Sequence, residues 1–151
     1  MKIFLLLLLV TVLSCTGNQS VKKVNQPDTL QTSKKKDMVN IVKLNDIQTN
    51  DWEKIRMEVM HNCIGPCFKK YKVIDDCENC NRLLMGYSIS IDSLGKAVKI
   101  EKIREEIECS LNKAQIKELN EQIITYLKSK EFPPSLRNIS FEAGVGFILR
   151  C

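Results

Sequence analysis

The sequence predicts an α+β fold in which helices pack on a small antiparallel sheet of three strands. Apolar residues recur at helical spacing in two segments, and they alternate with polar residues in two others. In chain order these segments are residues 51–62, 83–103, 112–130 and 138–149. The expected element order is therefore helix, β-hairpin, helix and final strand.

The first helix is expected over residues 51–62. Its apolar positions recur at helical spacing, as one buried helix face requires: Trp52, Ile55, Val59, Met60 and Cys63. Asn50, with Glu53 three residues later, forms a candidate capping box at its start. Gly65 and Pro66 are expected to interrupt this helix, and Pro66 can then begin a short second one.

A β-hairpin is expected next. One face of its first strand is apolar, at every second residue: Leu83, Met85, Tyr87, Ile89 and Ile91. Residues 92–95 supply turn chemistry, because Gly95 is free to adopt a positive φ. Extended character resumes over residues 97–103 and completes the hairpin.

The third segment has a helix signature at both ends. Asn112, with Gln115 three residues later, is a candidate capping box, and the two prolines after Phe132 stop the helix. Between them lies an apolar face made of Ile116, Leu119, Ile123 and Leu127. The final strand again alternates, with one apolar face made of Ile139, Phe141, Ala143, Val145, Phe147 and Leu149.

The first 14 residues resemble a bacterial lipoprotein signal peptide. Lys2 precedes an apolar run over residues 3–10, which is too short to span a bilayer. The sequence Leu13, Ser14 and Cys15 resembles a lipobox, which implies cleavage before Cys15 and attachment of palmitate and other acyl chains to it. Ordinary secretion without a lipid is the alternative.

Residues 15–49 are expected to form the lipidated N-terminus and a flexible polar tether. Residues 16–49 contain no aromatic side chain and are rich in polar ones, so they cannot bury enough apolar surface to fold alone. The apolar patch at residues 38–44 is a candidate for docking on the domain. The globular domain is then expected over residues 50–151.

The charge of the chain argues against nucleic-acid binding. The formal net charge is +5, and removal of the signal peptide takes away only Lys2, which leaves +4. The basic cluster of Lys34, Lys35 and Lys36 lies in the expected tether, where a solvated charge is the simpler interpretation. The expected partners are a membrane, through the lipid, and an envelope protein.

The domain resembles the C-terminal domain of the TonB energy-transducer family, in particular its AgmX/PglI-like branch. The resemblance rests on the first hairpin strand, the Asp-x-x-Gly-Lys turn at residues 92–96, the helix exit at residues 130–134, the final alternating strand, and Cys67 with Phe68. It implies the fold described above. It also implies that the final strand accepts an extended peptide.

Two features depart from that family. Residues 73–82, which contain Cys77 and Cys80, look inserted, and the helical cysteine expected near Gln122 is absent while Cys109 precedes the helix. A working TonB resembles an inner-membrane helix followed by a long Pro-rich spacer. A lipid anchor with a short tether cannot transmit proton-motive force by that route, so the resemblance carries the fold and not the energy coupling.

Six cysteines remain after Cys15: Cys63, Cys67, Cys77, Cys80, Cys109 and Cys151. An even number in a small exported domain predicts three disulfides, of unspecified pairing. A zinc site made by Cys63, Cys67, Cys77 and Cys80 is an alternative, because four thiolates on two short turns can surround one metal. Thiol-redox chemistry is another, because Gly65, Pro66 and Cys67 resemble part of a thioredoxin-like site.

No catalytic motif is recognisable. The chain has no Gly-rich phosphate loop, no His-Glu-x-x-His and no Gly-x-Ser-x-Gly. His61 is near Cys63, but a partly exposed helix residue is the simpler interpretation. Glu105, Glu106 and Glu108 are read as a solvated surface. The expected protein is not an enzyme and needs no cofactor, unless zinc binds the four cysteines.

The final strand is expected at a sheet edge, where it would bind an extended segment of a partner by strand addition. The candidate binding residues are Ser140, Glu142, Gly144 and Gly146. The two glycines would allow close approach of another backbone. The alternative is that the apolar patch at residues 38–44 covers this edge, as proteins often protect such strands.

The function expected from these features is that of a non-enzymatic envelope lipoprotein with a TonB-like protein-interaction domain. Thr16 stands where an Asp would resemble an inner-membrane retention signal, which favours the outer membrane with the domain facing the periplasm. A metal-binding or thiol-redox lipoprotein and a surface adhesin are the alternatives.

The anchor assignment is tested by replacing Cys15. Cys15→Ala should abolish labelling by a fatty-acid probe and release the protein into the soluble fraction, because no acyl chain would then hold it. Labelling and membrane fractionation of the two proteins measure this. Unchanged membrane association of the variant would refute the assignment.

Overall fold

The computed structural model describes residues 41–151. The predicted signal peptide, Cys15 and most of the predicted tether lie outside the described residues. In chain order the elements are α1 (Asp46–Val59), a π-helical turn (Met60–Ile64), α2 (Gly65–Tyr71), β1 (Cys80–Ile91), β2 (Ala97–Cys109), α3 (Lys113–Ser129), a 3₁₀ turn (Pro134–Leu136) and β3 (Ile139–Ile148). Within this part of the chain, no helix has the length and apolar character needed to cross a bilayer.

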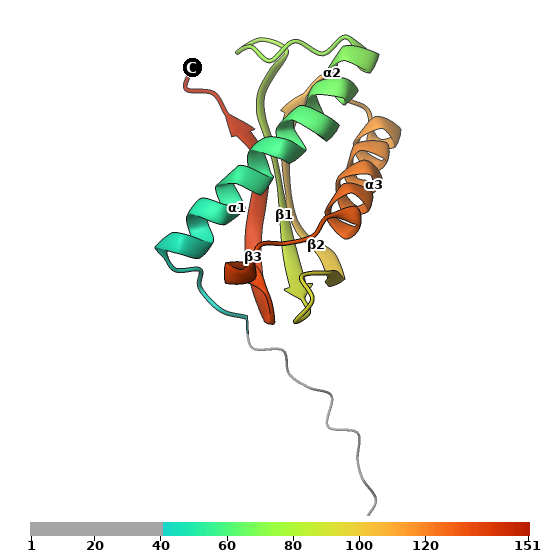
Figure 1. Ribbon diagram of the computed structural model, residues 1–151. Helices are drawn as coiled ribbons and strands as arrows, with labels where there is room; N and C mark the ends of the chain where they lie inside the picture. The colour runs from blue at the N-terminus through green and yellow to red at the C-terminus, as the bar shows by residue number, and fades with distance from the viewer. Residues whose placement is uncertain (1–40) are drawn as a thin grey trace, which may run out of the picture. The chain divides into compact units, whose positions relative to one another are not determined.

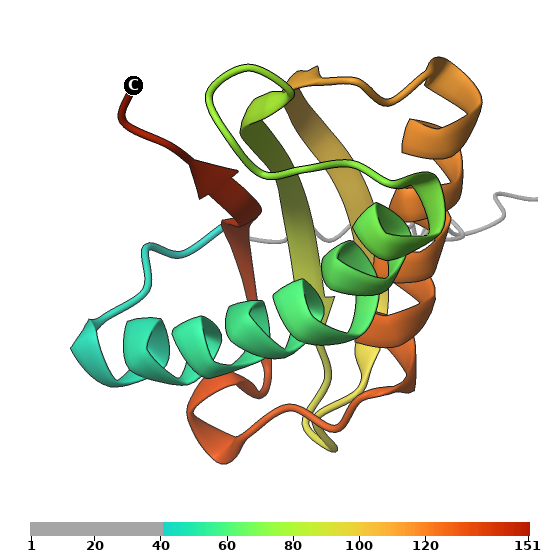
Figure 2. The same ribbon diagram turned by 90° about the horizontal axis from the view of Figure 1, so that it is seen from above.

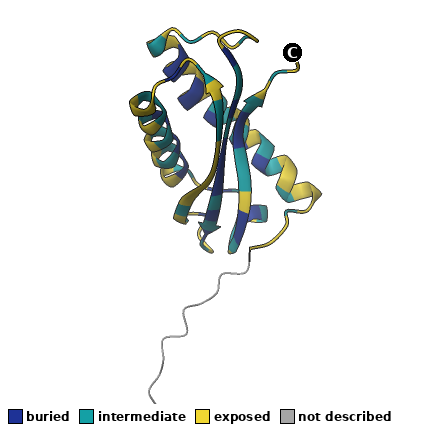
Figure 3. Cartoon of the chain, turned by 180° about the vertical axis from the view of Figure 1, so that it is seen from behind, coloured by how far each residue is buried: buried dark blue, intermediate teal, exposed yellow. Residues whose placement is uncertain are grey.

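The predicted α+β class and three-stranded antiparallel sheet are confirmed. The strand order is β2-β1-β3, so the final strand returns beside the first strand of the hairpin. The helices lie on one face of the sheet (Figures 1 and 2). From behind, the strands lie in front of the helices and their outer face is uncovered (Figure 3).

The core forms where β1 meets the helices. The alternating face predicted from the sequence is buried along its whole length, with at most 4% exposure at Ile91. Tyr87 lies on this face, and its hydroxyl donates a hydrogen bond to Asn120 Oδ1 on α3 at 2.9 Å. Burial raises the pKa of Tyr87, so this hydroxyl keeps its proton. The central strand is thus fixed to α3 by packing and by one polar contact.

The first helix begins earlier than predicted. Asn45 is the N-cap: its side chain accepts a hydrogen bond from the Gln48 N–H at 3.0 Å, and the Gln48 side chain accepts one from the Asn45 N–H at 2.9 Å. The predicted capping box of Asn50 and Glu53 is therefore wrong. Both residues lie inside the helix, because an equivalent box five residues upstream already satisfies the first free N–H groups.

The prediction at Gly65 and Pro66 is half right: a short α-helix, α2, does begin there with Pro66 in its first turn, but the helical backbone is not interrupted. Helical backbone continues from Asp46 to Tyr71 through the π-helical turn, in which the Gly65 N–H bonds to the Met60 carbonyl. A proline inside a regular helix collides with the carbonyl four residues earlier. The wider π turn immediately before Pro66 changes that spacing, which explains how the helix passes through this position.

The hairpin is confirmed and is longer than predicted. β2 continues to Cys109, so Glu105, Glu106 and Glu108 belong to a strand paired with β1, where Glu105 and Glu108 are exposed as expected for a solvated surface. The turn has the expected chemistry, with Gly95 at φ +80°. The Asp92 carboxylate accepts hydrogen bonds from the N–H groups two and four residues later.

The predictions for the helix after the hairpin, α3, and for the final strand, β3, are also confirmed. Asn112 and Gln115 form the capping box of α3. Leu119, Ile123 and Leu127 are fully buried. The backbone becomes extended at Lys130, before the two prolines, and the completely buried Phe132 holds the connection to β3 against the core.

Gly146 has a backbone conformation that other residues avoid. Its φ is +121°, and a Cβ atom added there would lie 1.8 Å from the Leu83 carbonyl oxygen of β1. Gly144 has an ordinary φ, and its added Cβ would meet only the Leu84 side-chain tip at 3.3 Å and a carbonyl at 3.9 Å. Position 146 therefore requires glycine, whereas position 144 can accept a small side chain.

This difference predicts the outcome of two matched substitutions. Gly146→Ala should lower the free energy of unfolding by at least about 2 kcal/mol, because it combines backbone strain with a clash. Gly144→Ala should cost less than about 1 kcal/mol, because a side-chain tip can move aside. Chemical unfolding monitored by circular dichroism measures both, and equal losses would contradict the account.

Candidate functional site: the exposed edge of β3

β3 is an edge strand whose inner side pairs with β1. The pairing is regular from Ile139 to Ile148. Alternate residues of an antiparallel strand direct their backbone N–H and C=O groups away from the paired neighbour. Ser140 is one such residue, so Glu142 and Gly144 direct their backbone groups to the same outer side. This outer side is the candidate site.

The first end of this edge is covered by the chain itself. The Val42 N–H donates a hydrogen bond to the Ser140 carbonyl at 2.8 Å, and Ile41 forms a parallel bridge with Ser140. Ser140 is only 5% exposed, and its hydroxyl bonds to Ser90 of β1 at 2.7 Å. Self-coverage by the predicted apolar patch thus holds at Ser140. Residues 38–40 of the patch lie outside the described residues.

The other end of the edge is covered by α1. Arg56 Nη1 donates a hydrogen bond to the Gly146 carbonyl at 3.0 Å, while its Nη2 lies 2.7 Å from the Glu53 carboxylate. The sequence reasoning assigned Gly146 to the approach of a partner backbone. In the structure its missing side chain admits the backbone of β1 instead.

Between these two ends lies a short stretch that we call the open edge, residues 142–144. Among residues 41–151, no backbone group bonds to the outer N–H and C=O groups of Glu142 or Gly144. A groove of about 600 Å³, the edge groove, runs beside the open edge. Its walls include Val42, Leu44, Thr49, Trp52, Glu53 and Ala143.

Glu142 adds a charge to the open edge. Its side chain is exposed, and no ion pair in the described part of the chain includes it. The neighbouring acid, Glu53, is instead paired with Arg56. The site therefore combines unpaired backbone donors and acceptors, a groove with both apolar and polar walls, and a carboxylate that forms no ion pair within the described residues. These are the elements that strand addition uses.

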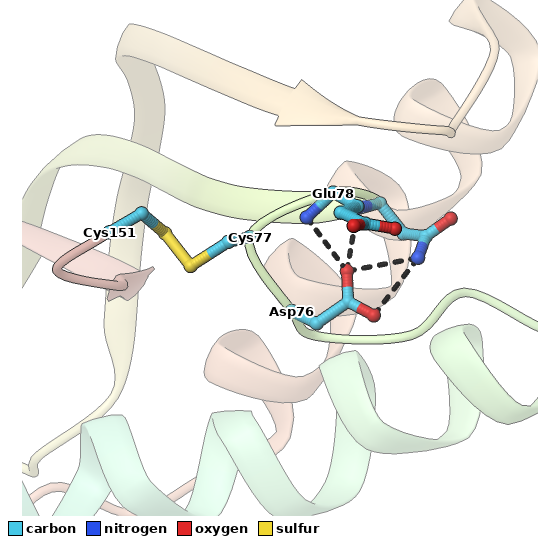
Figure 4. The surroundings of a disulfide bond; sticks show 5 residues. Asp76, Cys77, Glu78 and Cys151 are labelled. Carbon is cyan, nitrogen blue, oxygen red and sulfur yellow. Dashed lines mark hydrogen bonds between the residues drawn. A yellow bond between two sulfur atoms is a disulfide. The ribbon is translucent and has the colours of Figure 1, made fainter.

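The cysteines form two disulfides at the end of the sheet opposite the hairpin turn. Cys77 is bonded to Cys151, and Cys80 is bonded to Cys109 directly across the β1 and β2 pair. Figure 4 shows the first of these, beside the carboxylate of Asp76, which accepts hydrogen bonds from the backbone N–H groups of Glu78 and Asn79. The expected use of disulfides is confirmed for these four cysteines.

The expected third disulfide is absent from the structure. Cys63 and Cys67 are free, and both are buried in the helical segment that covers the sheet. Cys63 Sγ lies 3.9 Å from the Gln122 carbonyl of α3, so it faces a helix that offers no cysteine to pair with. These two thiols act as small apolar side chains in the core.

The four cysteines of the zinc alternative are not brought together. Cys77 and Cys80 are bonded to two different partners, and residues 41–151 contain no group of three or more metal-binding side chains with suitable geometry. Burial raises the pKa of the Cys63 and Cys67 thiols, and Glu118 raises that of Cys67 further. Raised pKa values disfavour the thiolate that redox chemistry needs. His61 is exposed in the π-helical turn.

Sequence reasoning missed the features that delimit the open edge. No spacing rule indicated that Arg56 would reach Gly146, because it lies on the polar part of a helix pattern. The tether patch did indicate that residues near Val42 could cover the strand. Trp52 was expected in the core. Its place in a groove wall could not be predicted, because it depends on where α1 crosses β3.

Comparison with known proteins gives no further guide to the site. No family model, no curated protein and no solved structure matches the chain.

The disulfide assignment is tested by counting thiols. In the native protein, iodoacetamide should label neither Cys63 nor Cys67, because both are buried. In denaturant without reductant it should label these two, and after reduction all six cysteines beyond Cys15. Mass spectrometry of peptides measures each stage. Labelling of Cys77 or Cys109 before reduction would refute the pairing.

Proposed function

We propose that this protein is a lipid-anchored envelope protein whose domain binds a partner protein by strand addition at the open edge. Its role is to hold that partner and not to catalyse a reaction. The partner contributes an extended segment, which pairs with β3 from outside the sheet. The domain faces the periplasm from the outer membrane.

The observation that carries this proposal is the arrangement of the edge. An exposed edge strand invites pairing with other chains, and proteins usually cover it. Here Val42 covers the first end and Arg56 covers the other. Between them, the backbone groups of Glu142 and Gly144 face a groove of about 600 Å³. Because both ends of the β3 edge are covered, an added strand can form backbone hydrogen bonds only with residues 142–144.

Two further observations support the proposal. The resemblance to TonB-like domains, drawn from residues 92–96 and 130–134, implies that the final strand accepts an extended peptide. The two disulfides suit an oxidising compartment, as expected for a protein that follows a signal peptide. The anchor itself rests on Cys15, which lies outside the described residues.

Photocrosslinking in living cells tests the binding site. A photoreactive amino acid at Glu142 should capture a second protein, because a strand added to the open edge lies within bonding distance of it. The same amino acid at Glu121 is the matched control, because this glutamate is also exposed but lies on α3. Immunoblotting and mass spectrometry of the adducts measure the result.

Two outcomes would contradict the proposal. One is capture confined to the protein's own chain at Glu142, which would show that its own residues occupy the edge. The other is the same adducts, in the same amounts, from Glu142 and Glu121, which would show that capture does not depend on the edge.

A further inference from the structure

The open edge has a different surface on each side of the sheet, and this difference limits what can bind. Side chains of an added strand would alternate between the two sides. The residue opposite Glu142 and the residue opposite Gly144 would lie two apart on the outer, helix-free face. The residue between them would point into the edge groove on the helix side.

We propose that the partner segment carries three consecutive side chains of defined chemistry at this site. One is basic and lies opposite Glu142, the next is aliphatic and enters the edge groove, and the third is aromatic and lies opposite Gly144. This inference rests on the proposed strand addition and names the chemistry of its partner.

The basic side chain follows from charge complementarity. Glu142 is exposed and unpaired among the described residues, and Ser88, its neighbour on β1, is neutral. On the far side of Ser88, Glu101 is already bonded to Lys99 at 3.0 Å. Among the described residues, no cation forms an ion pair with Glu142: Arg104, which lines the same hollow of the outer face, is bonded to Glu106, and Lys43 lies in the edge groove without pairing with Glu142. Oppositely charged residues directly across two strands stabilise their pairing.

The aromatic side chain follows from a pair of glycines. Gly144 of β3 lies directly opposite Gly86 of β1, so two adjacent positions on the outer face have no side chain. They form the floor of a hollow of about 220 Å³, the glycine hollow, bounded by Leu84, Ile103 and Arg104. Ile103 is 50% exposed at its wall.

The glycine hollow can be filled only by a side chain that comes from outside β1 and β3. A Cβ added to Gly86 would lie 2.9 Å from the Arg104 Cβ, so β1 cannot fill it. A large side chain on the strand next to Gly144 can lean across both glycines and contact Leu84 and Ile103. Aromatic residues beside strand glycines stabilise designed sheets in this way.

The aliphatic side chain follows from the walls of the edge groove. Ala143 lies between Glu142 and Gly144 and directs its small side chain to the helix side. Leu44 and Trp52 form apolar walls beside it, and Trp52 is fixed by an edge-to-face contact with Phe141 at 5.6 Å. An aliphatic side chain next to Ala143 would contact both of these walls.

Selection from a displayed library of random heptapeptides tests the inference, with the full-length protein in detergent as the target. The peptides enriched should contain a basic, an aliphatic and an aromatic residue in consecutive positions, in the one order that fits the strand direction. Replacing the aromatic residue of a selected peptide by Ala should weaken binding about tenfold, by loss of buried aromatic contact.

Two variants of the protein separate the contributions. Gly144→Val introduces a strand-forming residue and fills the glycine hollow, so it should bind the aromatic and Ala peptides equally. Glu142→Gln should lose the preference for the basic residue, an effect of about threefold, and keep the preference for the aromatic one. Circular dichroism confirms that both variants are folded.

The outcomes distinguish this inference from the proposed function. Enriched peptides that lack the pattern but compete with the partner captured at Glu142 would overturn the inference and leave strand addition standing. The same holds if Gly144→Val retains the aromatic preference. Failure to enrich any peptide, together with capture of only the protein's own chain at Glu142, would overturn both.

Discussion

Burial of one face of β1 is the interaction on which the rest of the structure depends. Five alternating side chains, from Leu83 to Ile91, are almost completely buried beneath the helices. Each contributes on the order of 2 kcal/mol by leaving water. Their burial fixes where the long helical segment and α3 must lie. Since the helical segment crosses the sheet beside β3, the same packing places Trp52 and Arg56 next to the edge. The site is therefore a consequence of the core.

Covering only one face of the sheet leaves the other face and the edge of β3 to be protected by other means. Salt bridges span the outer face, for example from Arg82 of β1 to Glu106 and Glu108 of β2. Val42 and Arg56 protect the two ends of the edge. Each protection uses a local contact and none requires an additional strand. The open edge between them keeps its backbone groups available for pairing. Proteins usually cover such groups, because an open edge strand promotes aggregation.

Much of the fold could be predicted from the sequence because it follows local rules. Alternation identified the buried face of β1, and the Asn112 and Gln115 pair marked the start of α3. The failures have specific causes. Asn45 and Asn50 each have a suitable partner three residues later, so the sequence pattern could not show that the helix begins at the first of them. A π-helical turn let the helix continue through Pro66. The pairing of the cysteines and the reach of Arg56 to Gly146 depend on distances between elements that a sequence pattern does not contain.

The size of the open edge bears on how an anchored protein would use it. Glu142 and Gly144 together offer two outward N–H groups and two outward C=O groups. Each backbone hydrogen bond contributes about 1 kcal/mol net, so the backbone alone gives weak binding. Pockets on both sides of the sheet would add specificity and some affinity. Attachment of the domain and its partner to the same envelope would raise their effective concentration, so that weak pairing is sufficient for a stable association. In the proposed function, a short binding edge and a membrane anchor are therefore complementary: the first would keep the interaction specific and reversible, and the second would make it occur often enough.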